Sequence, residues 1–446
     1  MLTRKQFIKQ ASLATVGAMA LPHLSRSFAP SDKLRIGVIG TGLRGQDHIE
    51  LCLRRNDVDL VAICDIQQVM LDDTMKIFAI ANKTKPRIFT GDKYAYRKML
   101  EAKDIDAVII ATPWEWHYEM SIDAMNAGKH VGCEVIAATT LEEIRNLIEI
   151  QAQTGMQYSV LENVCYRRDV MAIMNMLRQG MFGELIHLQG GYQHDLREVK
   201  FNNGTQPYGG GAEFNEKGFS EAQWRTQHSL KRNGDLYPTH GIGPLAMMCD
   251  INRGNRFTSL VSYASKARGL HEHIVNTGGE SHPNAGLKWM LGDVVTTMIK
   301  TEREETILLQ HDTSLPRPYS LGFRVQGTRG LWMDVNKSIY LEGKTKEKHR
   351  WEDAKPYLDE YDHPLWKKFA ADAQGAGHGG MDFFVLHEFI EALRNKTAVP
   401  IDIYDAATWT AITPLSEESI SKGGISVAFP DFTKGKYKVR QNIFAR

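Results

Sequence analysis

Two side chains able to handle protons, Tyr237 and His240, stand three residues apart in the stretch Gly234-Asp-Leu-Tyr-Pro-Thr-His-Gly-Ile-Gly-Pro244. This spacing places both on one face if the segment turns helically. A histidine titrates near neutral pH and serves as acid or base, and a nearby phenol can donate or accept a hydrogen bond. Because the chain has 16 histidines, the alternative is that His240 is only a hydrogen-bonded structural residue. The same alternative holds for three further polar residues: Tyr192, Arg225 and Tyr319.

A second chemical pattern is formed by Gly40, Gly42 and Gly45, which follow a short apolar run and precede a helix-compatible segment. The first glycine allows a tight turn, the second lets the backbone approach a pyrophosphate, and the third permits close packing of helix on strand. Asp65 follows a second apolar run, residues 58–64, at the distance where a carboxylate accepts both ribose hydroxyls of NAD and repels the 2′-phosphate of NADP. The glycines alone could be a flexible turn, but in this context they predict NAD binding.

The elements around this motif predict a Rossmann domain over residues 30–163. Strands and helices alternate there, which is typical of a doubly wound parallel sheet with helices on both faces. The run 107–113 reads as the fourth strand, and its carboxyl end delivers Trp114-Glu-Trp-His117 to the nicotinamide half of the cofactor. Trp114 and Trp116 could instead be packing residues. Later strands, residues 130–133 and 156–161, present a last group of polar residues at their tips: Glu134, Glu162 and Asn163.

After Asn163 the pattern changes and predicts a second, α+β domain over residues 164–446 with an open, mostly antiparallel sheet. The glycine-rich segments 209–211 and 375–380 are loops, either plain connections or lids over a site. The expected strands are residues 185–193, 257–263, 293–300, 305–311 and 319–327, and the expected helices are residues 168–179 and 381–394. The helix 381–394 and the segment 404–410 are expected to return and pack on the rest.

The first 29 residues predict an export signal. They combine a basic start at Arg4-Lys5, an apolar core over residues 11–21 that is too short to span a bilayer, and a small-x-small site at Ser27-Phe-Ala29. The segment resembles a twin-arginine signal, with Arg-Lys in place of Arg-Arg, so a general secretory route or a lipid-free anchor is the alternative. We therefore expect a periplasmic protein that folds around its cofactor before export and is not stably inserted in a membrane.

Size and composition limit the partners. A chain of 446 residues suggests two domains, and 42% hydrophobic with 24% charged residues is typical of a globular protein. Because 54 basic residues almost cancel 53 acidic ones, no field favours nucleic acid or an anionic membrane, and a neutral small molecule is the expected partner. The cysteines are odd in number and form no CxxC pair, which indicates buried thiols rather than disulfides or a metal site. They are Cys52, Cys64, Cys133, Cys165 and Cys249.

Long stretches of the chain resemble glycoside hydrolase family 109, the NAD-dependent α-N-acetylgalactosaminidases of the glucose-fructose oxidoreductase and inositol dehydrogenase superfamily. The resemblance covers nearly the whole chain after the signal. It is carried by residues 162–169, 190–197, 224–228, 234–244, 251–256, 282–284, 317–327, 361–366 and 375–382. It implies the two-domain fold described above and a glycan substrate with a terminal N-acetylhexosamine; a homo-oligomer remains open.

The resemblance also implies residue roles, with no metal. The NAD contacts would be Leu43, Arg44, Asp65, Trp114, His117, Glu134, Val135 and Asn163, beside the glycines Gly40, Gly42 and Gly45. The sugar contacts would be Tyr192, Arg225, Tyr237, His240 and Tyr319, with Glu162 near the reacting ring.

The mechanism implied by the family oxidises C3 of the sugar, removes the C2 proton, expels the aglycone from C1, adds water and reduces C3 again, so that NAD is not consumed. His240, helped by Tyr237, would move the proton at C3 and Tyr192 the one at C2. NAD-dependent glycosidases do not need the usual pair of carboxylates.

Two other functions are weighed against this one. A sugar dehydrogenase of the superfamily usually carries Glu-Lys-Pro where this chain has Glu134-Val-Ile136, and it would need free NAD outside the cytoplasm. A sugar-binding protein would not need Tyr237 and His240 together. The hydrolase is therefore favoured, followed by the dehydrogenase.

Overall fold

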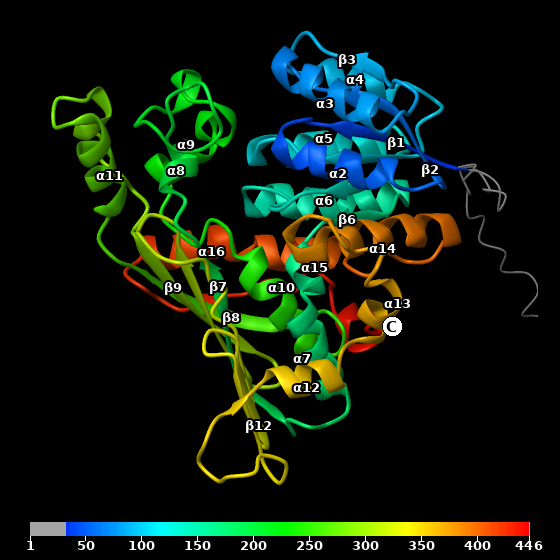
Figure 1. The fold of residues 1–446 in the computed structure, drawn as a ribbon. Helices are drawn as coiled ribbons and strands as arrows, with labels where there is room; N and C mark the ends of the chain where they lie inside the picture. The colour runs from blue at the N-terminus through cyan, green and yellow to red at the C-terminus, as the bar shows by residue number, and fades with distance from the viewer. Residues whose placement is uncertain (1–32, 446) are drawn as a thin grey trace, which may run out of the picture. The chain divides into compact units, whose positions relative to one another are not determined.

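The computed structural model describes residues 33–445, which contain two β-sheets and the helices that cover them (Figure 1). The expected export signal, residues 1–29, lies outside the described residues. Within residues 33–445 no helix is long and apolar enough to cross a membrane. All five cysteines are buried and unpaired.

The first sheet has six parallel strands in the order β3-β2-β1-β4-β5-β6, which confirms the doubly wound sheet. Its central strands are buried throughout and therefore read as continuous apolar runs. The strands are β1 (Leu34–Ile39), β2 (Val58–Cys64), β3 (Arg87–Phe89), β4 (Ala107–Ile110), β5 (His130–Cys133) and β6 (Tyr158–Val160). The helices between them are α2 (Leu43–Leu53), α3 (Gln68–Ile80), α4 (Ala95–Leu100), α5 (Trp114–Asn126) and α6 (Leu141–Thr154).

The strand order reverses between β1 and β4, and a crevice opens at such a point outside the carboxyl ends of the strands. Helix α2 begins there directly after Gly42. Helix α5 begins at Trp114, because Pro113 both ends the strand segment and serves as the N-cap. Trp114 and His117 are therefore held on the first turn of a helix rather than in a loop.

The second sheet has nine strands in the order β14-β13-β12-β11-β7-β10-β9-β8-β15. Every pair is antiparallel except β7 with β10, which confirms the open, mostly antiparallel sheet. The strands are β7 (Leu185–Gln193), β8 (Phe257–Ala264), β9 (Val294–Thr301), β10 (Thr306–Asp312), β11 (Arg324–Gly327), β12 (Gly330–Met333), β13 (Ser338–Leu341), β14 (Glu352–Asp353) and β15 (Val427–Ala428).

One expected strand was too long. Residues 319–327 were expected to be extended, but β11 covers only the last four, and the earlier part makes a single bridge between Ser320 and Gln193. Gly322 has a φ of 62°, which turns the chain away from the sheet before β11 begins.

The helices of the second part of the chain, which follows β6, pack on both sheets. Helix α10 approaches β7 so closely that a Cβ on Gly241 would lie 2.5 Å from the backbone nitrogen of Gly191. Helices α14 and α15, orange in Figure 1, return to the first sheet, where Ser159 of β6 donates to the carbonyl of Ile401 at 2.9 Å. The helices are α7 (Arg168–Arg178), α10 (Thr239–Met248), α12 (Lys355–Glu360), α13 (Pro364–Phe369), α14 (Met381–Asn395), α15 (Ile403–Thr410) and α16 (Ile412–Ser421), with 3-10 turns η1 (Asn163–Tyr166), η5 (His378–Gly380) and η6 (Lys436–Lys438).

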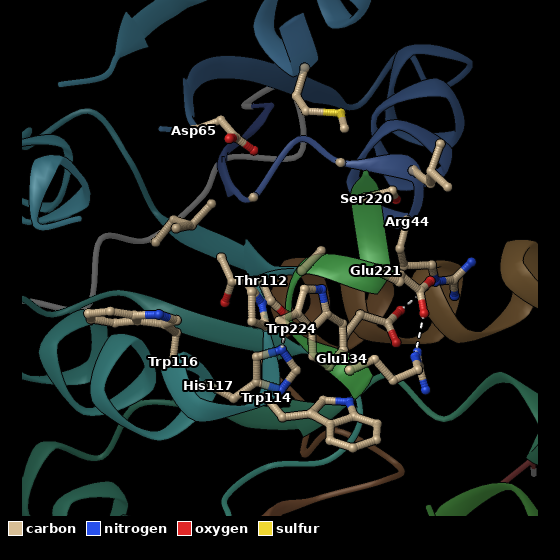
Figure 2. Close-up of a pocket in the computed structure, with 18 of the residues that line it drawn as sticks. Arg44, Asp65, Thr112, Trp114, Trp116, His117, Glu134, Ser220, Glu221 and Trp224 are labelled. Atoms are coloured by element: carbon tan, nitrogen blue, oxygen red, sulfur yellow. Dashed lines mark hydrogen bonds and ion pairs between the residues drawn. The ribbon is translucent and has the colours of Figure 1, made fainter. Parts of the chain in front are cut away.

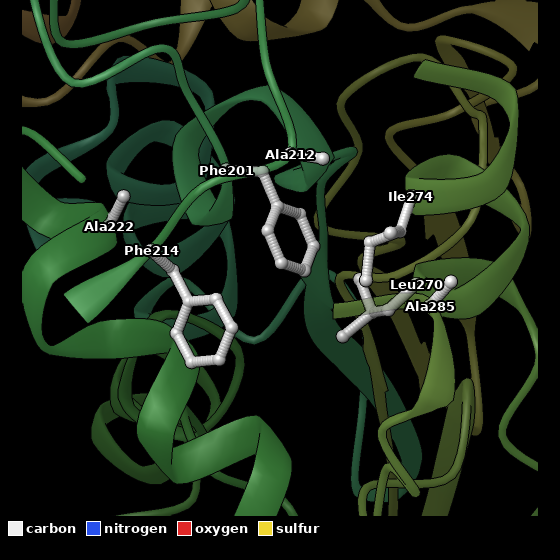
Figure 3. Packing of buried hydrophobic residues seen from close by; sticks show 7 residues of the cluster. All are labelled: Phe201, Ala212, Phe214, Ala222, Leu270, Ile274 and Ala285. Carbon is white, nitrogen blue, oxygen red and sulfur yellow. The ribbon is translucent and has the colours of Figure 1, made fainter. Parts of the chain in front are cut away.

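A separate group of short helices, here called the lobe, comprises residues 197–231 and 269–286. Figure 3 shows the core of the lobe, in which Phe201 and Phe214 lie between residues of both segments. The lobe contains α8 (Arg197–Lys200), η2 (Asn215–Lys217), η3 (Ser220–Gln223), α9 (Arg225–Lys231), α11 (Gly269–Gly278) and η4 (Pro283–Gly286). Its buried residues are Phe201, Ala212, Phe214, Ala222, Leu270, Ile274 and Ala285.

Candidate active site

Two adjoining cavities lie between the carboxyl ends of the first sheet and the second part of the chain. The first has a volume of about 520 Å³ and the second about 940 Å³, and Tyr192, His240 and His378 line both. The first cavity brings together most of the site residues expected from the sequence: Gly40, Gly42, Leu43, Arg44, Asp65, Trp114, His117, Glu134, Val135, Asn163, Tyr192, Arg225, Tyr237 and His240. Tyr319 lines the second cavity, and Gly45 and Glu162 line neither.

The three glycines form a turn that fits a dinucleotide. Gly40 has a φ of 87°, and a Cβ there would lie 2.5 Å from the carbonyl oxygen of Ala111. A Cβ on Gly45 would lie 2.0 Å from the oxygen of Gly40, whereas the space around Gly42 is open. Gly42 caps α2 without any side-chain hydrogen bond, so the N-H groups of the first turn are available to a phosphate.

Asp65 lies beside this turn, at the opposite end of the first cavity from Trp114 and His117 (Figure 2). Each of its carboxylate oxygens accepts one backbone N-H, from Thr41 at 2.7 Å and from Gln67 at 2.8 Å. The oxygen bonded to the Thr41 N-H also accepts the Thr41 hydroxyl at 3.3 Å, so the oxygen bonded to Gln67 is the one with a further lone pair for a ribose hydroxyl.

Arg44 joins the two halves of the site, as Figure 2 shows for its contact with Glu134. Its guanidinium donates to Glu134 at 2.7 Å and to Asp382 of α14 at 2.7 Å. Burial alone would raise the pKa of Glu134, but Arg44 and a 2.7 Å hydrogen bond from His48 outweigh it and lower the pKa to about 2. Glu134 is therefore ionised at the wall of the first cavity.

Asp382, which was not expected from the sequence, is the second anion of this group. It is fully buried and accepts hydrogen bonds from Asn163 at 2.6 Å and from His378 at 2.7 Å. The amide oxygen of Asn163 is buried with no partner among the described residues, although Asn163 lines the cavity. A buried acceptor without a partner fits a site in which a bound cofactor supplies the missing hydrogen-bond donor.

His117 holds the strand ends together rather than offering a free nitrogen to a ligand. Its ring nitrogens lie 2.7 Å from the carbonyl oxygen of Thr112 and 2.6 Å from that of Ile136. Two carbonyl acceptors require two N-H donors, and therefore an imidazolium. Burial disfavours this charge, but Cys133 and the two carbonyls outweigh burial and raise the pKa of His117 to about 9.

An arginine lies among three aromatic rings between the cavities. The guanidinium of Arg225 is 4.9 Å from the ring of Trp114, 5.0 Å from that of Trp224 and 5.5 Å from that of Tyr237, and it is ion-paired with Glu221. Cation–π contacts of this kind orient both the cation and the rings. Trp224 and Glu221 belong to the lobe, so this segment supplies one wall of the cofactor cavity.

His240 and Glu162 form a hydrogen-bonded pair. The Nδ1 of His240 lies 2.8–2.9 Å from both carboxylate oxygens of Glu162, which is fully buried and also accepts the N-H of Val164 at 3.0 Å. The bond to Nδ1 leaves Nε2 for a ligand. Glu162 thus acts through His240 and not from the cavity wall.

Two phenols complete the group. The ring centre of Tyr237 lies 4.8 Å from that of His240 and 4.6 Å from that of Tyr192. Tyr237 precedes α10, so the three-residue spacing brings it to His240 across the start of that helix. Burial raises the pKa of both phenols, so both are protonated at neutral pH. The hydroxyl of Tyr192 lies 3.1 Å from Nδ1 of His194, and burial and the nearby Arg225 lower the pKa of His194.

The second cavity has several charged side chains in its wall. The ring of Tyr319, which is half exposed, lies 4.9 Å from that of His194. The charged residues include Arg167, Asp169, Asp334, Lys337, Asp353 and Lys355. Among residues 33–445 no group of side chains could hold a metal ion.

A parallel sheet with this glycine turn, next to a histidine and tyrosine cluster beside a second, open sheet, defines an NAD-binding protein of the Rossmann type. The family model of the oxidoreductase NAD-binding Rossmann fold matches residues 34–162. Among solved structures, levoglucosan dehydrogenase in complex with NADH has a TM-score of 0.66 at 21% identity, covering 90% of this chain and 100% of that one. A scyllo-inositol dehydrogenase from Lactobacillus casei has a TM-score of 0.59 at 15% identity, covering 89% and 99%.

The family itself is shown by the rest of the chain. The model of the glycosyl hydrolase 109 C-terminal domain matches residues 166–439. A glycosyl hydrolase family 109 protein from Stenotrophomonas maltophilia is 56% identical over 449 residues, covering 100% of this chain and 98% of that protein. An alpha-N-acetylgalactosaminidase from Tannerella forsythia is 49% identical over 465 residues, covering 99% of each. The chain belongs to glycoside hydrolase family 109.

Proposed function

We propose that this protein is an NAD-dependent glycosidase that releases terminal N-acetylgalactosamine from a glycan. The observation that carries the proposal is the position of the His240–Glu162 pair and the phenols of Tyr192 and Tyr237 where the cofactor cavity meets the second cavity. A sugar ring at this junction would face the dinucleotide on one side and extend into the second cavity on the other. The name of the Tannerella forsythia relative supports the sugar chosen.

The first steps assign protons to particular atoms. Bound NAD would supply a hydride acceptor that oxidises C3 of the sugar and gives the hydride back at the end of the cycle. Nε2 of His240 accepts the proton of the C3 hydroxyl, and the buried carboxylate of Glu162 stabilises the imidazolium that forms. Tyr237, beside His240, donates a hydrogen bond at the same hydroxyl.

The C2 proton is then removed by Tyr192. A ketone at C3 acidifies this proton, and Tyr192 would take it in the phenolate form. The nearby guanidinium of Arg225 favours the phenolate, although burial opposes it. The aglycone leaves C1, and water adds in its place. Arg225 and Tyr319 orient the sugar from opposite sides.

The rival dehydrogenase reaction is disfavoured because the lysine that usually serves as base in dehydrogenases of the superfamily is missing. The superfamily lysine is replaced in the segment Glu134-Val-Ile136, and Val135 is buried at the cavity wall. Resemblance to the dehydrogenase structures, at 21% identity or less, concerns the fold alone.

The purified chain, with no cofactor added, should release nitrophenol from p-nitrophenyl α-N-acetylgalactosaminide. His240→Ala should lower the rate by about 10²–10⁴-fold, the usual effect of losing a positioned acid or base. His349→Ala, at an exposed position that lines neither cavity, is the matched control. Steady reduction of added NAD by free sugars, with no nitrophenol released, would instead identify a dehydrogenase.

A further inference from the structure

Three charged side chains that the proposed reaction does not use line the second cavity and not the first: Arg167, Asp169 and Asp334. Arg167 lies between the two carboxylates. Its Nε donates to Asp169 at 2.6 Å, and its Nη2 donates to Asp334 at 3.0 Å. These three residues are called the Arg167 cluster below.

The Arg167 cluster is held by regular elements of the fold. Arg167 directly follows η1, and Asp334 directly follows β12. A second bond from Nη2 to Asp169, at 2.8 Å, makes that pair bidentate. The guanidinium lies 4.9 Å from the centre of the Phe323 ring, and the carbonyl of Phe323 accepts the N-H of Asp334 at 3.0 Å. Side chains fixed in this way can bind a ligand in one defined geometry.

The cluster has hydrogen-bonding capacity that the protein does not use. The side chain of Asp334 is 10% exposed, and its Oδ1 is buried with no partner among the described residues. Nη1 of Arg167 likewise makes no hydrogen bond within residues 33–445, because the bonds to both carboxylates come from Nε and Nη2. A buried acceptor normally has a partner. The wall of the second cavity therefore offers a ligand one acceptor and, on the adjacent side chain, one donor.

The chemistry of the cluster indicates what the ligand is. Hydroxyls of a sugar ring can donate to Asp334 and accept from Arg167, since each hydroxyl is both a donor and an acceptor. Two carboxylates against one guanidinium leave the cluster with a net negative charge, which disfavours an acidic sugar. The ligand that fits is a neutral sugar.

The cluster lies within reach of the proposed reaction centre. The second cavity, with a volume of about 940 Å³, is lined by Tyr192 and His240 as well as by the cluster. Tyr319 connects the two groups: burial raises the pKa of its phenol to about 12, and the charges of Arg167, Glu162 and Asp334 also act on it. A sugar attached to a residue bound at His240 therefore extends past Tyr319 toward Asp334.

We propose that Arg167 and Asp334 bind the neutral sugar to which the terminal N-acetylgalactosamine is attached, through two hydroxyls of that sugar; the assignment rests on the proposed function. The protein therefore prefers a saccharide as the leaving group over a serine side chain, which offers no such pair of hydroxyls. The contacts are the same before and during bond cleavage, so they lower KM and leave kcat nearly unaffected.

The test compares leaving groups. The substrates are three disaccharides with N-acetylgalactosamine α-linked to O3, O4 or O6 of galactose, the same sugar α-linked to N-acetylserine amide, and the p-nitrophenyl glycoside. The wild type should cleave at least one disaccharide with a kcat/KM about tenfold or more above that of the serine glycoside. In Asp334→Asn, kcat/KM for that disaccharide should fall by about 10–100-fold relative to the serine glycoside, mainly through KM, the usual effect of losing a hydrogen bond to a charged group.

Asp73→Asn, on α3 in an exposed pair with Lys76 and lining neither cavity, is the matched control. Asp334→Ser replaces the variant if Asp334→Asn does not fold. The subsite is overturned by an equal loss with the disaccharide and the serine glycoside, by no loss with the disaccharide, or by a wild type that releases nitrophenol but cleaves no disaccharide. A wild type that releases nothing from any of the substrates would instead reject the proposed function itself.

Discussion

Gly42 and Gly45 stand three residues apart but should respond differently to the same substitution. A Cβ on Gly45 would meet the oxygen of Gly40 at 2.0 Å, whereas a Cβ on Gly42 would meet nothing within 4 Å. Gly45 is therefore required by the fold, and Gly42 by the ligand, which needs the backbone to come close to the pyrophosphate.

Gly42→Ala should leave the thermal midpoint of the cofactor-free protein unchanged and weaken NAD binding by about tenfold or more, since a Cβ enters the phosphate site. Gly45→Ala should lower the midpoint itself. Calorimetric titration with NAD and thermal unfolding of the stripped protein measure the two effects. A Gly42→Ala protein that binds NAD as tightly as the wild type would contradict this account of the turn.

Sequence and spacing predicted which residues gather at the first cavity better than they predicted what each residue does there. Asp65, Trp114 and Glu134 follow strands or begin helices, and the edge of a parallel sheet brings such positions together. The contacts of Arg44 with Asp382, 338 residues away, could not be predicted, because nothing local in the sequence links them. For the same reason His378 was expected only as part of a glycine-rich loop.

At the level of elements, the lobe connects the cofactor cavity to the rest of the second part. It supplies Glu221, Gln223 and Trp224 to the cavity wall, and Gln67 at the turn after β2 donates to Gln223 at 2.9 Å. This wall was not predicted from the sequence, because the helices of the lobe have three to seven residues apart from α11, too few for a hydrophobic period to be recognised. By contrast, β7, β8, β9, β10, α7 and α14 each lie within one residue of their expected bounds.

Loss of the lobe's contact should therefore weaken cofactor retention. Gln223→Ala removes the link to Gln67, and the fraction of NAD that stays with the protein through gel filtration should fall while the midpoint of unfolding changes little. Gln68→Ala, whose amide bonds only to its exposed neighbour Asp72, is the control. Equal NAD retention by all three proteins would show that the lobe does not hold the cofactor.

For the molecule as a whole, one buried ion pair ties α10 and the turn after it to α15. Arg253 and Asp405 are each 1% exposed in their side chains and lie 2.5 Å apart, and Arg253 also donates to the carbonyl of Pro400 at 3.0 Å. Burial raises the pKa of Asp405, and Arg253 opposes this. Burying such a pair carries a free-energy penalty, because both charges lose their hydration. Removing one partner is nevertheless destabilising, because the other charge is then buried without a counter-charge.

Asp405→Asn should destabilise the protein by about 3–5 kcal/mol, the usual cost of leaving one buried charge unpaired. Urea unfolding followed by circular dichroism measures this change. Lys355→Ala breaks an exposed pair with Asp359, whose side chains are 73% and 65% exposed, and should scarcely move the midpoint. If Asp405→Asn changes the free energy of unfolding as little as Lys355→Ala does, the pair between Arg253 and Asp405 adds little to stability.

The central claim, that the glycosidic bond is cleaved by oxidation and elimination rather than by direct displacement, is tested most directly at C2 of the released sugar. The purified protein is incubated with p-nitrophenyl α-N-acetylgalactosaminide in deuterated water, and the product is examined by NMR. Because Tyr192 removes and returns the C2 proton, the account predicts deuterium at C2 of every sugar released, with no net reduction of NAD. Released sugar that keeps its original hydrogen at C2 would contradict it.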